Sequence, residues 1–276
     1  MNPFEVFLTT PILNLLIAYY AALKTLFIPW ALGFAIILLT VTIRLVLWPL
    51  TGVQLKSTQK MAALKPHLDR IKLEHGHDKI RHQQEVSKLY KEHGVNPLSG
   101  CLPMILQIPV FIALYNVLLK IVQVNGDFLN KINSQLYFSF LHLDKVPDTY
   151  FLGFNLSDKP NQWQQAGILI LAIPILTGLL QLIQSKMLTP ALPPSPSITP
   201  VKKTDSKGEI EDTMAQVSSQ MTLIMPLMIA FFSYGFPVGL SLYWNTFTII
   251  GIIQQYVISG PGALNKYLPK RWQKQS

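Results

Sequence analysis

The chain has 276 residues, of which half are apolar and only 13% are charged. Soluble domains carry about 25% charged residues, and disordered chains combine low hydrophobicity with high charge density. This composition therefore excludes disorder and argues against a single soluble core. The net charge is +9 and the mean hydropathy is +0.32. In a chain this apolar, an excess of Lys and Arg indicates cytoplasmic loops and contact with membrane lipids rather than specific binding of nucleic acid.

The first segment, residues 1–29, is expected to form an N-terminal interfacial amphipathic helix. Its apolar stretch is interrupted by Pro11, Asn14 and Lys24, which suits a helix lying in the membrane interface better than the alternative, a helix that crosses the bilayer. Glu5 stands where a secretory signal would carry a basic residue, so we expect the segment to be retained.

Five further segments hold the roughly 20 apolar residues that a helix needs to cross the hydrocarbon core. These predicted spans are residues 30–50, 97–122, 163–186, 217–236 and 238–258. The segments outside them are a helical hairpin at 51–96, a loop at 123–162, a Pro-rich loop at 187–216 and a basic tail at 259–276. Nine Lys and Arg lie in the hairpin, four in the tail and four in residues 185–217, against three in the loop at 123–162. The hairpin, the Pro-rich loop and the tail are therefore predicted to be cytoplasmic. The loop at 123–162 and the N-terminus are then outside.

The hairpin is the one substantial water-soluble helical region in this prediction. Apolar residues at spacings of three and four predict two antiparallel helices separated by a turn at residues 75–78. The seam of the first helix consists of Met61, Leu64, Leu68 and Ile71. Pro66 falls inside this first helix and is expected to kink it.

Arg44 is the sharpest feature of the predicted spans. A charge inside the bilayer costs from about 2.5 to more than 10 kcal/mol, which makes such residues functional candidates. By itself, Arg44 is explained equally well by snorkelling of its long side chain to the interface. The other spans carry polar faces, which either bond to one another or line a wet cavity. The candidates for a hydrophilic groove are Arg44, Gln181, Gln184, Trp244, Asn245 and Thr248.

The residue types and motifs that the sequence lacks exclude several classes of function. The five predicted spans contain no Asp, Glu or His, the groups on which proton-coupled carriers and acid–base enzymes depend. The sequence has no phosphate-binding or dinucleotide-binding glycine motif and no nucleophile elbow. Its histidines lack the spacing of a metal site. We therefore expect neither an enzyme nor a bound metal or cofactor.

Four stretches closely resemble the YidC-type membrane protein insertases, also known as the YidC/Oxa/Alb family. They are GFAIILLTVTIRLVLWPL at 33–50, VNPLSGCLP at 95–103, QIPVFIALY at 107–115 and FPVGLSLYW at 236–244. Lys65-Pro66 in the hairpin adds to the resemblance. The match runs in order over residues 30–258, and it resembles the short form of the family, without a large extracytoplasmic domain before the first core span.

The resemblance implies five transmembrane helices around a hydrophilic groove that is open to the cytoplasm and to lipid. Arg44 in this groove would attract acidic residues of an incoming protein, with Gln184, Trp244 and Asn245 lining it. Lys65 and Pro66 would belong to a hairpin that receives the client. The implied partners are nascent membrane proteins, with the Sec translocon and the ribosome as further partners. The implied location is the bacterial plasma membrane.

Two other classes of function remain open from the residues. A small-anion transporter or channel would use Arg44 as its binding charge, although the odd number of spans and the absence of a visible repeat speak against it. A purely structural assembly factor would insert nothing when reconstituted alone. Solute flux and client insertion in liposomes distinguish the three classes.

Overall fold

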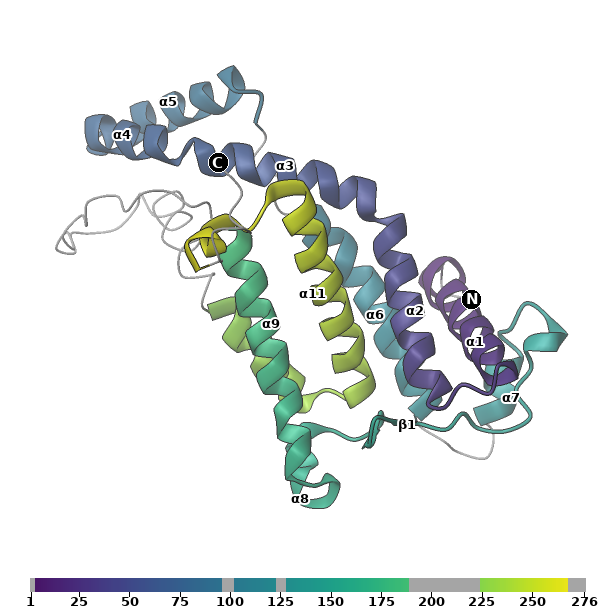
Figure 1. Cartoon of the computed structure of the whole chain (residues 1–276). Helices are drawn as coiled ribbons and strands as arrows, with labels where there is room; N and C mark the ends of the chain where they lie inside the picture. The colour runs from purple at the N-terminus through teal and green to yellow at the C-terminus, as the bar shows by residue number, and fades with distance from the viewer. Residues whose placement is uncertain (1–2, 96–101, 123–127, 189–223, 268–276) are drawn as a thin grey trace. The chain divides into compact units, whose positions relative to one another are not determined.

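The computed structural model describes residues 3–95, 102–122, 128–188 and 224–267 (Figure 1). The chain divides into two compact units. The first unit comprises Met1–Trp48, Met104–Leu180 and Leu227–Gly251. The second comprises Pro49–Pro103, Gln181–Pro226 and Ile252–Ser276. The described residues are mostly helical, as the hydropathy pattern predicts.

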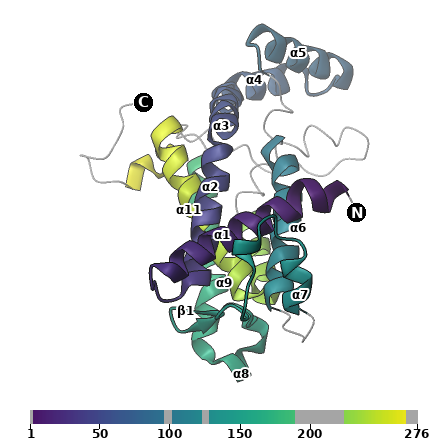
Figure 2. The ribbon, with the colours of Figure 1, turned by 90° about the vertical axis from the view of Figure 1, so that its right-hand side faces the viewer.

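The first unit contains helices from all parts of the sequence. They are η1 (Glu5–Thr9), α1 (Thr10–Thr25), α2 (Ala31–Val46), most of α6 (Leu102–Val122), the first half of α9 (Ala172–Leu188), most of the helix Ile224–Gly235 and the first two-thirds of α11 (Val238–Ser259). Pro11 occupies the first turn of α1, where its missing N–H costs no helical hydrogen bond. The helix α1 packs against α2 and runs obliquely across it rather than alongside it (Figure 2).

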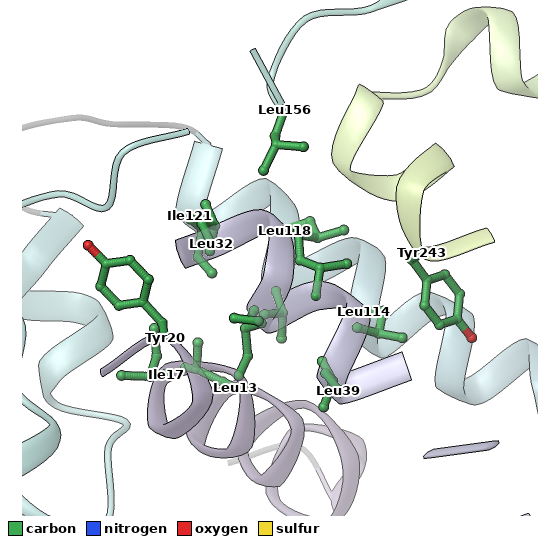
Figure 3. Close-up of a cluster of buried hydrophobic side chains, with 14 of the residues drawn as sticks. Leu13, Ile17, Tyr20, Leu32, Leu39, Leu114, Leu118, Ile121, Leu156 and Tyr243 are labelled. Carbon is green, nitrogen blue, oxygen red and sulfur yellow. The ribbon is translucent and has the colours of Figure 1, made fainter. Parts of the chain in front are cut away.

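The core of this unit forms where α1, α2, α6 and α11 meet (Figure 3). Large side chains from all four helices are fully buried there: Leu13, Ile17, Leu39, Leu114, Ile121 and Tyr243. The helix α1 contributes its buried face to this core, and its opposite face stays partly exposed. Because its Leu13 and Ile17 side chains are fully buried between the other three helices, α1 is an integral part of the unit.

A small β-hairpin departs from the predicted all-α fold. Strand β1 (Tyr150–Phe151) pairs antiparallel with β2 (Phe154–Asn155). The two turn residues, Leu152 and Gly153, have φ values of 48° and 88°. Two-residue hairpin turns favour positive φ at both positions because the resulting twist matches that of the strands. The hairpin holds the ring of Phe151 against α2, where it meets Trp30 and Phe34 edge-on.

Further short elements lie on either side of the β-hairpin. Before it come α7 (Phe128–Asn133) and η3 (Ser139–Leu141), and after it come η4 (Pro160–Gln162), α8 (Trp163–Ala166) and η5 (Ile168–Leu171). The predicted span at 163–186 is therefore not one continuous helix. Gly167, with φ of 91°, separates α8 from η5 because a helix cannot continue through that backbone conformation.

The segment that directly follows the β-hairpin caps the start of α11. The backbone N–H of Val238 donates to Asp158 O at 2.8 Å, and that of Gly239 donates to Leu156 O at 2.9 Å. The first N–H groups of a helix have no partner inside the helix. Loop carbonyls supply that partner here, so residues 156–158 fix where α11 begins.

The second unit contains nearly all of α3 (Trp48–Ala63) together with α4 (Lys65–His75), α5 (Lys79–Glu92) and η6 (Gly262–Tyr267). The helices α4 and α5 lie side by side (Figure 1). Leu64, Leu89 and Val95 form their buried seam, and Met61, Leu68, Ile71 and Tyr90 pack against it. The side chain of Asp78 accepts from the N–H groups of Ile80 and Arg81 and caps α5.

Two prolines act differently from the prediction. Pro66 does not kink a continuous helix, because α3 ends at Ala63 and Pro66 lies in the first turn of α4. The span predicted at 30–50 is also interrupted: α2 ends at Val46, and α3 begins at Trp48 with Pro49 in its first turn. In both cases the ring stands at a helix start, where proline is tolerated, rather than in an interior.

Within the described residues, two helical segments, Glu5–Thr25 and Ile168–Leu188, are long and apolar enough to cross a membrane. A third is reached if the bent pair formed by α2 and the following Trp48–Met61 counts as one span. Parts of the spans predicted at 97–122 and 217–236 lie outside the described residues. The coarse prediction of a helical protein with several apolar segments is confirmed, and the number of five spans stays a prediction.

Candidate functional site

Arg44 is buried near the end of the apolar helix α2, with only 5% of its surface exposed. Its Nε donates a hydrogen bond to the backbone O of Phe247 at 3.1 Å. The guanidinium carbon lies 3.6 Å from the centroid of the Phe247 ring, a cation–π contact. The arginine is thus held against α11 by a carbonyl and a ring of the same residue. A fixed positive charge at the α2–α11 contact is the central feature of the site.

A polar and aromatic cluster on α6 and α11 adjoins Phe247. The Nε2 of Gln107 donates to the hydroxyl of Tyr243 at 2.5 Å, and the Tyr243 ring lies 5.9 Å from that of Phe247. The ring of Phe111 meets Trp244 edge-on at 5.4 Å. Tyr243 is 1% exposed, so its hydroxyl needs the bond from Gln107 to offset the loss of water. The cluster joins α6 to α11, the helix whose Phe247 contacts Arg44.

Asn245 and Thr248, two of the predicted groove residues, differ in how their polar atoms are used. Thr248 donates its hydroxyl to Trp244 O, in its own helix, at 2.9 Å. Asn245 is 8% exposed, and its Oδ1 has no hydrogen-bond partner among the residues that the structure describes. A buried acceptor without a donor costs about 1–3 kcal/mol. The Asn245 oxygen is therefore a position that a water or a donor from another molecule would stabilise.

A second polar cluster links three helices of the same unit. The hydroxyl of Ser233 lies 3.3 Å from that of Thr177 and 3.0 Å from that of Ser241, and all three residues are buried. These bonds join α9, the helix Ile224–Gly235 and α11. The polar residues Thr177 and Ser241 therefore serve helix packing, which is the common role of small hydroxyl residues between membrane helices.

The remaining predicted site residues lie in the second unit. Gln181 and Gln184 stand on the later part of α9 and are half-buried. Pro66 is exposed at the start of α4, and the side chain of Lys65 lies outside what the structure describes. Their contribution to one site with Arg44 stays a prediction.

Sequence reasoning missed Phe247 and Ser233. An aromatic residue inside an apolar helix carries no polar signal, so nothing in the sequence marked Phe247 as the partner of Arg44. Ser233 stands alone near the end of its helix, and only the fold brings it between Thr177 and Ser241.

Long apolar helices, an arginine buried in one apolar helix and polar contacts between helices are the features of a helical membrane protein. The family model of the 60Kd inner membrane protein matches residues 23–263. The chain belongs to this family, which agrees with the resemblance of its motifs to YidC-type insertases.

Several curated proteins are similar over most of the chain. A "Membrane protein insertase YidC" of Syntrophobacter fumaroxidans is 33% identical over 227 residues, which cover 82% of this chain and 34% of that protein. One of Pelagibacter ubique is 32% identical over 258 residues, covering 92% and 39%. The chloroplastic "Inner membrane ALBINO3-like protein 1" of Chlamydomonas reinhardtii is 31% identical over 264 residues, covering 91% and 49%.

A solved structure is also similar. It is described as an active YidC insertase crystal structure with the first transmembrane domain resolved, and it matches with a TM-score of 0.52 and 25% identity. The match covers 90% of this chain and 46% of that one. The chain thus spans between about a third and a half of the length of the relatives that it matches.

Proposed function

We propose that this protein is a membrane protein insertase and chaperone, which inserts nascent membrane proteins and helps them to fold. The observation that carries the proposal is Arg44: a cation buried in an apolar helix and held by α11, in a chain whose curated relatives are named insertases. The small-anion transporter would need the same charge, but the relatives named above do not support it.

The step that Arg44 would assist is the entry of a hydrophilic segment into the bilayer. Acidic residues in that segment would be attracted to the guanidinium, and this attraction is stronger in a low-dielectric setting than in water. The unpartnered Oδ1 of Asn245 supports a site that water or client polar groups enter. We therefore propose a hydrophilic groove with Arg44, Trp244, Asn245 and Thr248, and the contribution of Gln181 and Gln184 stays a prediction from the sequence.

The driving force would come from the client and the membrane rather than from a reaction. Burial of the client's apolar helix in lipid is favourable, and the membrane potential contributes about 2.3 kcal/mol per charge per 100 mV. Arg44 would lower the free-energy barrier to moving the client's polar segment into the bilayer. Burial of the client's apolar helix in lipid would then keep the inserted client in the membrane.

The topology that fits this role has five spans, an outer N-terminus and a cytoplasmic C-terminus in a bacterial plasma membrane. The hairpin at 51–96 would face the cytoplasm and receive clients through the region of Lys65 and Pro66. The Sec translocon and the ribosome are partners that this arrangement allows. The N-terminal segment 1–29 would lie in the outer interface.

The test is insertion of a labelled single-span client into liposomes that contain only the purified full chain. Protease protection measures the translocated tail. With an acidic tail we expect Arg44→Ala to reduce protection several-fold and Arg44→Lys to retain most of it. A client whose tail acids are changed to amides is expected to be insensitive to both variants.

A matched control is Lys120→Ala, which removes the same charge from a lysine bound to Gln135 and Glu5. It should leave the charge dependence of insertion unchanged. Insertion of the acidic client by Arg44→Ala at the wild-type level would refute the role of the arginine. Absence of insertion by the wild type would favour a structural assembly factor, and solute flux would favour the transporter.

A further inference from the structure

Three neighbouring aromatic residues after α7 point outward. Tyr137, Phe138 and Phe140 are 57%, 56% and 77% exposed. The rings of Phe138 and Phe140 stack, with centroids 5.3 Å apart and an interplanar angle of 21°. Aromatic side chains of this size usually lose most of their surface to a core. Three of them exposed within four residues form a patch, here called the aromatic tip, which the described residues leave uncovered.

The aromatic tip stands on a rigid base rather than on a loose loop. The side chain of Asn133 accepts from the N–H of Leu143 at 2.8 Å and donates to its carbonyl at 3.1 Å, which closes the loop on itself. Ile132, Leu141 and Leu143 are buried in the core beneath. The loop therefore has inward apolar anchors, and the three aromatic rings are its exposed large apolar side chains.

A second asparagine fastens this loop to α1. Asn14 is 6% exposed; its Nδ2 donates to Gln135 O at 2.9 Å, and its Oδ1 accepts from the N–H of Tyr137 at 2.7 Å. The two bonds reach the backbone immediately before the aromatic tip. The position of the tip is thus tied to the position of α1.

The residues around the aromatic tip indicate which environment it contacts. Val6 and Phe7, at the end of the same helical segment as Asn14, are 39% and 77% exposed. Exposed lysines flank the aromatic tip on both sides, at Lys131 and Lys145, with Asp144 the one acid between them. Aromatic rings beside basic residues are typical of the boundary between lipid headgroups and acyl chains. For a member of a membrane protein family, this boundary is the surface that fits aromatic rings flanked by lysines.

We propose that the aromatic tip is a bilayer-interface anchor, which Asn14 clamps to α1 so that helix and loop enter the interface as one body. This role is independent of Arg44 and of any client. It assigns a function to a segment outside the proposed groove and makes the lipid interface, rather than another protein, the partner of this surface.

The depth of the tip can be measured on the full chain in liposomes of zwitterionic and anionic phospholipid. Cys101 is the sole cysteine, so Cys101→Ser provides a background for a single spin label at Phe140→Cys. Lys145→Cys is the matched control, an exposed position in the same loop. Collision with a water-soluble nickel chelate is expected to be several-fold lower at 140 than at 145, and collision with oxygen higher. Equal access of the chelate to both sites would overturn the anchor, and would point to a protein as the partner.

The clamp is tested in the same labelled chain. Asn14→Ala removes both bonds to the loop, and we expect the chelate access at 140 to rise toward that at 145. Asn14→Asp keeps the acceptor for the Tyr137 N–H but loses the donor to Gln135, so an intermediate access is expected. Asn130→Ala, at an exposed position of α7, should change nothing. Unchanged depth at 140 in both Asn14 variants would refute the coupling between α1 and the tip.

Discussion

A Cβ atom added to Gly33 would overlap the ring of Phe151, so the β-hairpin packs directly onto the backbone of α2. Phe151 is 7% exposed and is confined by Trp30 and Phe34, which leaves the ring little room to move. This contact fastens the loop that also caps α11, and it joins two parts of the chain more than a hundred residues apart.

Gly33→Ala is therefore expected to destabilise the protein by about 1–3 kcal/mol, the usual cost of overpacking. Thermal unfolding in detergent measures the change. Gly235→Ala is the control, because nothing lies within 4 Å of a Cβ there. Adding Phe151→Leu should recover part of the loss, and a fully stable Gly33→Ala would contradict the close contact.

Ser233→Ala removes both hydroxyl contacts, to Thr177 and to Ser241. Interhelical hydrogen bonds in membrane proteins contribute about 0.6 kcal/mol each, so a loss of roughly 1 kcal/mol is expected. Denaturation in mixed detergent measures it, with Ser139→Ala, an exposed serine, as the control. Because the bond is shared, Ser241→Ala should cost less in the Ser233→Ala background than alone; equal costs would argue against the network.

The contact between Arg44 and Phe247 predicts energetic coupling. In a double-mutant cycle of Arg44→Leu and Phe247→Leu, the expected coupling is about 0.5–2 kcal/mol, the range of cation–π contacts. The bond from Arg44 Nε to the Phe247 carbonyl is unaffected by the second substitution. Phe151→Leu is the control partner: it contacts α2 at Gly33, roughly 16 Å along the helix from Arg44, and additive effects are expected there. A coupling near zero for both pairs would contradict the geometry.

Asp78 predicts a local effect in the second unit. Its carboxylate accepts from the N–H groups of Ile80 and Arg81 at 3.1 Å each, and loss of such a cap costs about 1 kcal/mol. Asp78→Ala should speed hydrogen exchange in the first turn of α5, while Asp78→Asn should preserve protection. Mass spectrometry on the full chain resolves the difference. Faster exchange in both variants would indicate that charge, rather than capping, protects this turn.

The helical hairpin and Asn14 show what a local sequence pattern can and cannot predict. The spacing of Met61, Leu64, Leu68 and Ile71 predicted the seam between α4 and α5 because helical periodicity is a local property. Asn14 interrupts an apolar stretch, and this pattern favours a helix that lies in the membrane interface. In the structure its side chain is buried and bonded to the loop before Tyr137, a role that no neighbouring residue in the sequence could signal.

The sequence by itself determined the family, the helical membrane class and the arginine inside the first predicted span, because hydropathy and motifs are local properties of the chain. The tertiary structure alone decided which residues from distant parts of the chain contact one another. Phe247 contacts Arg44 across a separation of 203 residues, Phe151 covers Gly33, and the carbonyls of Leu156 and Asp158 begin α11. Such pairs depend on the path of the whole chain. The local sequence around each residue predicts a helix or a strand, but it does not specify which distant residue becomes its neighbour.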